Sequence, residues 1–168
     1  MHYQVLKQVT NALSYVEIFL DKAEQHAADK KFDVGVLLTA RLAPDMKNLT
    51  YQVQSACDYV KGGAAWLSGQ TPPKHPDTEK TIDEIRARIR KTIEFAESIP
   101  ESQYAGASGQ KVELSWARGK AMAGDQYLLQ MVVPNVYFHI AMVYAVLRNN
   151  GVDVGKMDFL GQIDFVPA

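Results

Sequence analysis

The residue with the clearest chemical potential is His139, which lies near the middle of the most apolar segment of the chain, residues 131–147. A charged imidazolium is costly in such surroundings, so we expect a neutral ring with one donating and one accepting nitrogen. Asn135 lies one helical turn earlier on the same face. Two interpretations stay open: a core histidine held by a carbonyl or a tyrosine, or a residue that lines a ligand cavity between helices.

A second set of polar and aromatic residues recurs every seven positions earlier in the chain. Asp45, Gln52, Tyr59 and Trp66 would form one stripe along a helix. Asp45 also has a structural explanation, because a carboxylate in a first helical turn interacts well with the helix dipole. Gln52 either faces a pocket or lies on the flank of the helix, and Tyr59 and Trp66 are typical packing residues. We therefore take Asp45 and Gln52 as candidate ligand-binding residues.

The histidines argue against a metal site. A metal centre in a helical bundle needs several His, Asp or Glu side chains that converge from facing helices. No two histidines are spaced three or four residues apart, and only His139 is placed to reach a bundle interior. We predict no metal and no other cofactor. The alternative is a divalent metal held by His139 together with a carboxylate, Asp45 or Asp58.

Two other features have plain structural interpretations. Cys57 is the only cysteine, which excludes an internal disulfide and any zinc site built on several cysteines, and its apolar neighbours predict a small buried side chain. The basic residues at positions 86, 88, 90 and 91 are offset by acidic residues, which predicts a solvated helix face.

The elements that must position these residues are helices. Apolar residues recur at three- and four-residue steps in four segments, and the second follows an alternating four-three spacing. Long connections separate the second segment from the third and the third from the fourth. The pattern predicts an all-α four-helix bundle with long crossover connections. The four segments are residues 5–23, 42–67, 82–99 and 134–149.

Turn-forming and capping residues mark the predicted ends of the helices. Pro44 suits a first helical turn, and Ser68 with Gly69 would end that helix. Thr81 followed by Glu84 resembles a capping box. The residues Asn149-Asn150-Gly151 would close the last helix.

A small β-hairpin is predicted between the third and fourth helices. Residues 111–116 alternate polar and apolar side chains like a short strand. Residues 127–133 would pair with them across Gly119 and Gly124. The apolar residues of the tail, 152–168, have no clear period, and we expect them to pack on the bundle or on a partner chain.

Length and charge limit the remaining possibilities. The 168 residues fit a single domain, 1–168, and 18 basic against 19 acidic residues leave a net charge of −1. We therefore predict no nucleic-acid partner, since such binding needs a basic excess. The 17-residue apolar segment is shorter than the ~20 residues of a membrane span, so no membrane partner is expected. The first residues lack the pattern of a signal peptide, which predicts a cytoplasmic protein.

Two motifs resemble one branch of the DinB/YfiT-like superfamily, bacterial proteins described as a domain of unknown function. The first is residues 38–46 with Gln52 and the pair Cys57-Asp58. The second is residues 134–139, continuing through Tyr144 and residues 147–151 to residues 158–161. The resemblance spans essentially the whole chain and implies a DinB-like bundle, often dimeric, with a cavity at one end. It adds Tyr144 to the candidate ligand-binding residues.

The chain departs from the metal site of better-known superfamily members. The resemblance implies one histidine from the second helix and an H-x-x-x-H pair from the fourth. Here His139 has Asn135 four residues before it and Val143 four residues after it, and the second helix has no histidine. The metal and the thiol-transferase chemistry therefore do not carry over.

Three functional hypotheses follow from these residues. The first is a homodimer that binds a small molecule near His139, with Asn135, Gln52, Asp45 and Tyr144 around the cavity. The second is a diverged metal- or thiol-dependent transferase or hydrolase. The third is an interaction module whose polar core residues only fix the helix register. We rank the binding protein first.

Overall fold

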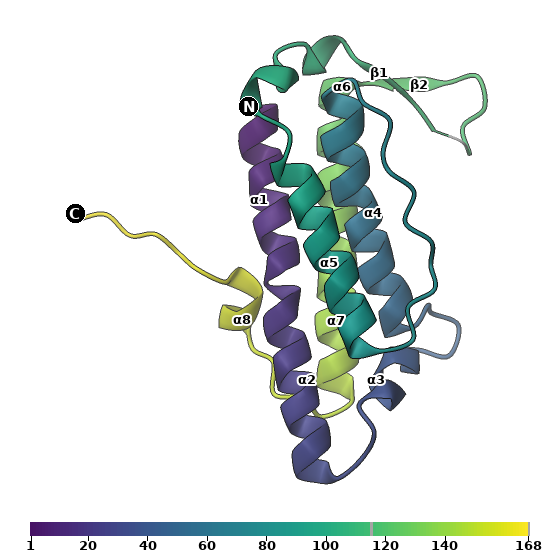
Figure 1. Ribbon diagram of the computed structural model, residues 1–168, viewed down its shortest axis with the longest axis vertical. Coiled ribbons are helices and arrows are strands. Elements are labelled where there is room, and N and C mark those ends of the chain that lie inside the picture. Colours follow the sequence, from purple (N-terminus) through teal and green to yellow (C-terminus); the bar gives the residue numbers. More distant parts are fainter. Residues whose placement is uncertain (115, 168) are drawn as a thin grey trace.

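A computed structural model describes residues 1–114 and 116–167. Its main elements are helices that run side by side along the long axis of the molecule (Figure 1). The polypeptide forms a four-helix bundle, as predicted. Its four rods are α1 (His2–Ser14) continued by α2 (Val16–Lys30), α4 (Leu49–Leu67), α5 (Ile82–Glu97) and α7 (Val133–Asn149).

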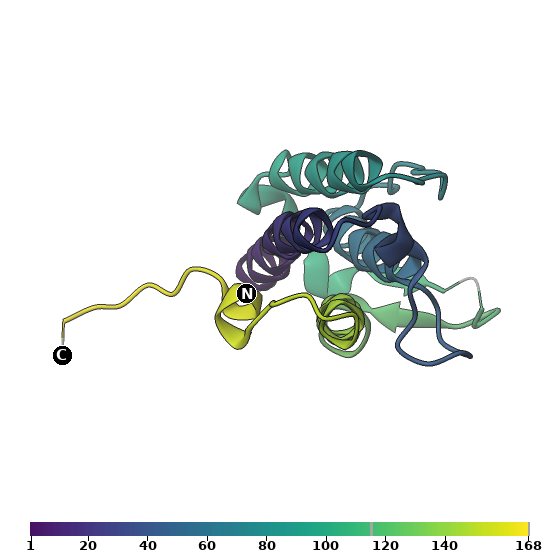
Figure 2. The same cartoon turned by 90° about the horizontal axis from the view of Figure 1, so that it is seen from below.

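The first rod is interrupted at a single residue. Tyr15 leaves the regular helix between α1 and α2 but keeps a right-handed helical conformation, with φ −68° and ψ −14°. The chain therefore continues in nearly the same direction, and α1 and α2 act as one rod. Viewed along the bundle, this rod lies between α5 and α7, with α4 beside it (Figure 2).

One continuous set of apolar side chains fills the space between the rods. Leu13, Phe19, Leu49, Ile89 and Leu147 are among its fully enclosed members. The closest packing involves α4, which contacts both α7 and α5 along much of its length. Because α4 carries Gln52 and α7 carries His139, this packing determines how the candidate site residues meet.

The second helix begins seven residues later than the sequence pattern predicted. Residues 40–48 form a loop, and α4 starts at Leu49 with Asn48 as its N-cap; the Asn48 side chain accepts a hydrogen bond from the Tyr51 amide. A short helix, α3 (Gly35–Thr39), precedes the loop. The predicted start at Pro44 was wrong because the Asn48 cap, which satisfies an amide of the first turn, defines the helix end.

The other predicted capping residues are confirmed, although the first rod, residues 2–30, extends beyond both ends of the predicted segment 5–23. The capping box of α5 forms in both directions, between the Thr81 and Glu84 side chains and the backbone. Ser68 caps α4, and Gly69 follows it with φ +77°. Gly151, with φ +86°, follows the end of α7. Left-handed backbone of this kind favours glycine, which explains these two positions.

The predicted hairpin exists, but its second strand lies elsewhere. Strand β1 (Lys111–Glu113) pairs antiparallel with β2 (Ala121–Ala123), with Val112 opposite Met122. Position 115, part of the predicted first strand, lies outside the described residues. Residues 127–133, predicted as the partner strand, are instead helical. They belong to α6 (Gly124–Tyr127), a π-helical turn η3 (Leu128–Val132) and the start of α7.

These three segments form one helix, Gly124–Asn149, which begins ten residues before the predicted start at Pro134. It is the one helix of the described residues that is long and apolar enough to cross a membrane by length and composition, with a hydropathy of 1.4. Val136, Ile140 and Val143 are buried in the bundle core, while Leu129 and Phe138 are about half exposed. One face of this helix packs in the bundle core and another apolar face is open, whereas α4 is the more deeply buried helix.

Two of the four basic residues on α5, Arg86 and Arg88, are buried, which corrects the expected solvated face at these positions, whereas Arg90 and Lys91 are exposed. The Arg88 side chain is 0% exposed and binds Asp58, Asp77 and Glu79. Arg86 contacts three acidic residues of α2. These arginines therefore connect α5 to α2, to α4 and to the proline-rich crossover (residues 70–81) that precedes it.

The tail packs on the bundle over its first part only. Val152 and Val154 are buried, and α8 (Lys156–Leu160) is held to α2 by the ion pair between Lys22 and Asp158. Beyond Gly161 the chain extends away from the bundle (Figure 1). Phe165 and Val166 are each 87% exposed.

Two short 3-10 turns complete the fold and close one end of the bundle. They are η1 (Glu101–Tyr104) and η2 (Ala107–Gly109), which follow α5. The η2 turn packs on α6. Asp125 of α6 accepts hydrogen bonds from Ser108 and from His2 at the start of α1, so three segments that are distant in sequence meet there.

Candidate functional site

The candidate site is centred on a direct contact between the second and fourth rods of the bundle. His139 of α7 lies with its Nδ1 atom 2.8 Å from the Oε1 atom of Gln52 on α4. Gln52 is 3% exposed, and His139 is partly buried. The structure therefore brings together two of the five residues predicted from the sequence, and it joins them by a hydrogen bond.

The hydrogen bonds of Gln52 fix the state of the imidazole. The amide nitrogen of Gln52 donates to the backbone carbonyl of Lys47 at 3.2 Å. The amide oxygen therefore faces His139, and an amide oxygen only accepts hydrogen bonds. The Nδ1 atom must then be the protonated nitrogen of His139. In the neutral ring, Nε2 retains its lone pair and can accept a hydrogen bond.

Burial keeps the ring neutral. It lowers the pKa of His139 below its usual range, because the enclosed site disfavours the charged imidazolium. A neutral ring at physiological pH is a hydrogen-bond acceptor at Nε2 and a weak base. The expected chemistry is therefore recognition of a donor group, which agrees with the tautomer fixed by Gln52.

Aromatic side chains surround the imidazole. Tyr59 stacks on it with an angle of 18° between the ring planes and 5.9 Å between the ring centres. Tyr51 and Phe138 meet it edge to face, at 6.3 and 5.2 Å. Burial, and then the neighbouring Tyr51, raise the pKa of Tyr59, so its phenol stays protonated. Such walls favour planar ligands.

Asn135 has a local role in the helix. Its side-chain nitrogen donates to the carbonyl of Met131 at 2.7 Å, within the π-helical turn that precedes Pro134. Proline has no amide hydrogen, so regular helical hydrogen bonding is interrupted at this point. π-helical turns are frequent at functional sites, and this one ends about two helical turns before His139.

Asp45 and Tyr144 are not brought to the His139 site. Asp45 is exposed in the loop 40–48, outside the helix on which it would have shared a stripe with Gln52. Tyr144 packs edge to face between Phe19 of α2 and Phe159 of α8, on another side of α7. Tyr144 thus connects the bundle to the short helix of the tail.

The donors around His139 do not fit the three-histidine metal site of the superfamily. The side chains available are the imidazole of His139 and the amides of Gln52 and Asn135. Both amides already donate to backbone carbonyls through their nitrogens. Asp58, the other carboxylate considered, binds Lys61 and Arg88. Among residues 1–114 and 116–167, no three His, Cys, Asp or Glu side chains are grouped to hold a metal. We derive no metal-dependent step for this site.

Sequence reasoning missed the aromatic walls of the site and a separate cavity. Tyr51 and Phe138 carried no spacing signal, although both lie next to residues that did, Gln52 and His139. The cavity lies between α1, α4 and α5, where α7 contributes no residue, and Tyr3 and Tyr104 line it. A hundred residues separate these two tyrosines, so no local pattern could have related them.

Comparison with known proteins assigns the chain to a family. Residues 1–160 match the model of the family described as a domain of unknown function (DUF1993), and the chain belongs to that family. A crystal structure of a DinB family member from Shewanella denitrificans is similar over 99% of this chain and 95% of that one, with 40% identity and a TM-score of 0.94. No curated protein matches the chain. The predicted DinB-like family and fold are therefore confirmed.

Proposed function

We propose that this protein binds a small planar molecule at His139 and does so without a metal. The observation that carries the proposal is the hydrogen bond from His139 to the buried Gln52, because it leaves Nε2 as a fixed acceptor beside Tyr51, Tyr59 and Phe138. A planar molecule with an N–H or O–H group would stack on these rings and donate to Nε2.

The surroundings of the site support the proposal. Phe138 is 53% and Tyr51 41% exposed, so these two aromatic walls remain partly open to solvent. The hairpin and the loop 40–48 project from the same side of the bundle as the α4–α7 pair (Figure 2). A ligand on this side would lie between two projecting segments.

The test uses indole and 1-methylindole, which have nearly the same shape but differ in the N–H donor. Titration of the full chain, followed by backbone amide NMR shifts, should show tighter binding of indole, and the ring-nitrogen shifts of His139 should report the hydrogen bond in the unmodified chain. The His139→Ala variant should lose this preference. The His26→Ala variant is the matched control, since His26 also lies against an aromatic ring, that of Phe32. Equal binding of both probes to the unmodified chain would contradict the proposal.

Elemental analysis of the untagged protein separates this function from the alternative of a diverged metal-dependent transferase or hydrolase. We expect no stoichiometric metal in the protein or in its His139→Ala variant. Stoichiometric zinc, nickel or iron that is lost in the variant would overturn the metal-free proposal and support the enzyme.

We further propose that the protein acts as a cytoplasmic homodimer. The apolar end of the tail supports an interaction with a second chain, because Ile163, Phe165 and Val166 are left 43–87% exposed. The single cysteine, Cys57, is a buried free thiol, which is compatible with a reducing compartment.

A further inference from the structure

A second cavity, far from the contacts of His139, has the features of a ligand site. It measures about 280 Å³ and lies between α1, α4, α5 and the 3-10 turn η1. Ala64 of α4 and Ala96 of α5 line it, and their small side chains leave the space open. The volume is near the lower limit for small-molecule sites, which favours a ligand of metabolite size.

Three hydroxyl groups line this cavity. Thr10 and Tyr104 are 3% and 6% exposed, and the ring of Tyr104 lies 6.0 Å from that of Tyr3. None of the hydrogen bonds among the described residues uses the side-chain hydroxyls of Tyr3, Thr10 or Tyr104. Because no protein group pairs with these hydroxyls and their oxygen atoms are not fully shielded from solvent, they are available to hydrogen-bond a molecule in the cavity. Burial raises the pKa of Tyr104 to about 12, so its phenol remains a donor.

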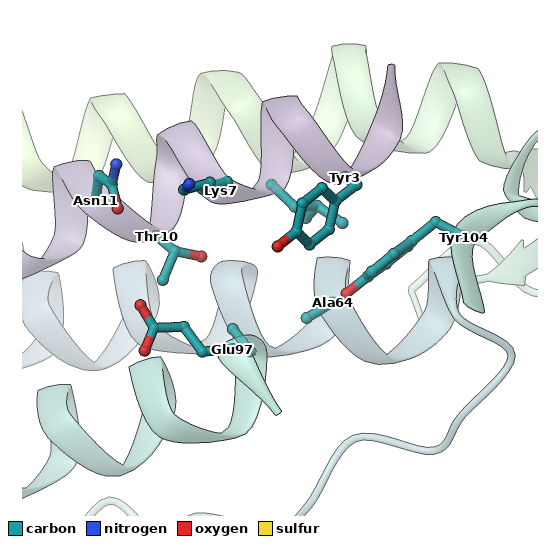
Figure 3. Close-up of a pocket in the computed structure, with 9 residues that line it drawn as sticks. Tyr3, Lys7, Thr10, Asn11, Ala64, Glu97 and Tyr104 are labelled. Carbon is teal, nitrogen blue, oxygen red and sulfur yellow. The ribbon is translucent and has the colours of Figure 1, made fainter. Parts of the chain in front are cut away.

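Two opposite charges lie at the cavity on different helices. Lys7 belongs to α1 and Glu97 to α5, and both are exposed to solvent. Neither takes part in any ion pair among residues 1–114 and 116–167. Figure 3 shows the Glu97 carboxylate near Thr10, while Tyr3 and Tyr104 lie together at the other end of the cavity. A ligand between these groups would meet a cation, an anion and two aromatic rings.

We propose that this cavity binds a small zwitterion with an apolar side chain, such as a free aromatic amino acid. Its ammonium group would pair with Glu97 and its carboxylate with Lys7. Its side chain would lie against Ala64 and the rings of Tyr3 and Tyr104. A molecule of one charge would satisfy only one of the two unpaired residues and would leave the other beside a like charge.

The test compares L-phenylalanine with two analogues that each lack one charge. Phenethylamine has no carboxylate, and 3-phenylpropionate has no ammonium group. In an NMR titration of the full chain, L-phenylalanine should bind up to about fivefold more tightly than either analogue, the upper end of the range for exposed ion pairs. The Glu97→Gln variant should lose the preference over 3-phenylpropionate, and the Lys7→Met variant the preference over phenethylamine.

Control variants separate this site from the rest of the protein. The Ala96→Leu variant should fill the cavity and abolish binding while it unfolds at a similar temperature; if it fails to fold, the two charge variants still decide. Glu94→Gln, one turn earlier on α5, should bind like the unmodified chain. His139→Ala should also leave binding unchanged, so the result is independent of the function proposed above. No shifts at about 10 mM L-phenylalanine, or equal binding of all three probes, would overturn the proposal.

Discussion

At the residue scale, Gln52 selects the tautomer of His139, as the hydrogen-bond partner of a metal-bound histidine does. The order of the hydrogen bonds matters, because the Lys47 carbonyl orients the amide and the amide then orients the imidazole proton. Asn135, four residues before His139, uses its side chain within the helix instead. The site thus presents one defined acceptor, the Nε2 atom of His139.

The first prediction concerns this tautomer. In the folded protein, ¹⁵N shifts of the His139 ring should identify Nδ1 as the protonated nitrogen at pH 7. Gln52→Leu should remove the preference, since a leucine of similar size cannot accept the Nδ1 proton. Gln54→Leu is a suitable control, because Gln54 is also buried on α4 but binds Glu79. An unchanged tautomer in Gln52→Leu would contradict the assignment.

A second prediction concerns His75 in the proline-rich crossover. Burial, together with the nearby Lys61, Lys91 and Arg88, lowers the pKa of His75 to about 4 from an unfolded value near 6.5. Between these two values the unfolded chain binds more protons, so the free energy of unfolding should rise with pH from about 4 to 6.5. The depressed pKa of His139 acts in the same direction.

The measurement is urea unfolding at a series of pH values. His75→Gln should reduce the rise in stability between pH 4.5 and 6.5, because the titrating group is gone. Thr78→Ala changes an exposed residue of the same crossover and should keep the slope of the unmodified protein. A slope that His75→Gln leaves intact would show that His75 is protonated equally in both states.

At the element scale, α5 is held to its neighbours by buried arginines rather than by apolar packing alone. Replacing Arg88 with methionine should destabilise the fold by about 3–5 kcal/mol, because Glu79, 8% exposed, would lose its cation and keep only the hydrogen bond from Gln54. Arg90→Met is the matched control on the same helix. The Arg90–Glu17 pair is exposed at the arginine, so its loss should cost far less than the loss of the Arg88 contacts. Chemical unfolding of both variants measures the difference, and equal costs would contradict it.

A fourth prediction concerns the contact between α6 and the turn η2. A Cβ atom at Gly124 would lie 1.9 Å from the carbonyl oxygen of Ala107, a backbone atom that cannot move aside without displacing the turn. Gly124→Ala should therefore lower the melting temperature by several degrees and disturb the hydrogen bonds that join His2, Ser108 and Asp125. Gly106→Ala, where a Cβ meets nothing within 4 Å, should be tolerated. Similar melting temperatures for both variants would show that the turn yields easily.

The elements also show what the sequence could and could not predict. Apolar periodicity located the four rods, because each must bury one face, and the Thr81 capping box is a local interaction. The start of α4 was misplaced because Pro44 and Asn48 are both acceptable starts, and only the folded loop decides between them. Residues 127–133 look like a strand by composition, yet they continue a helix whose partners lie far away in sequence.

The site was predictable in part for the same reason. His139 and Gln52 were recognisable as polar residues in apolar segments, but nothing in their spacing indicated that they bind each other. The separate cavity could not be predicted from the sequence, because it depends on the small side chains of Ala64 and Ala96. Alanine at a helix interface is ordinary, and only the packed structure shows where such residues leave space.

At the scale of the whole molecule, the bundle and the end of the tail are separate features. Residues up to Gly161 contact the bundle, where Phe159 meets Tyr144 and Gly161 lies against Tyr15, whereas Phe165 and Val166 extend into solvent. A chain that ends at Gly161 should therefore fold with the same stability. If the tail joins two copies, sedimentation should give a mass of twice 18.7 kDa for the full chain. The shortened chain should then sediment with the mass of one chain. A monomeric full chain would contradict the dimer, and a dimeric short chain would exclude the tail as its interface.

The π-helical turn Leu128–Val132 has a consequence for how this chain tolerates insertions and deletions. A turn of this kind holds one residue more than a regular helical turn. Deleting one residue there would restore regular geometry, and because the wider turn absorbs the extra residue, the helix on either side would keep nearly the same facing. The hairpin and α6 would keep their orientation, and His139 and Gln52 would keep their contact. Relatives could therefore gain or lose a single codon at this turn without rearranging either end of the bundle.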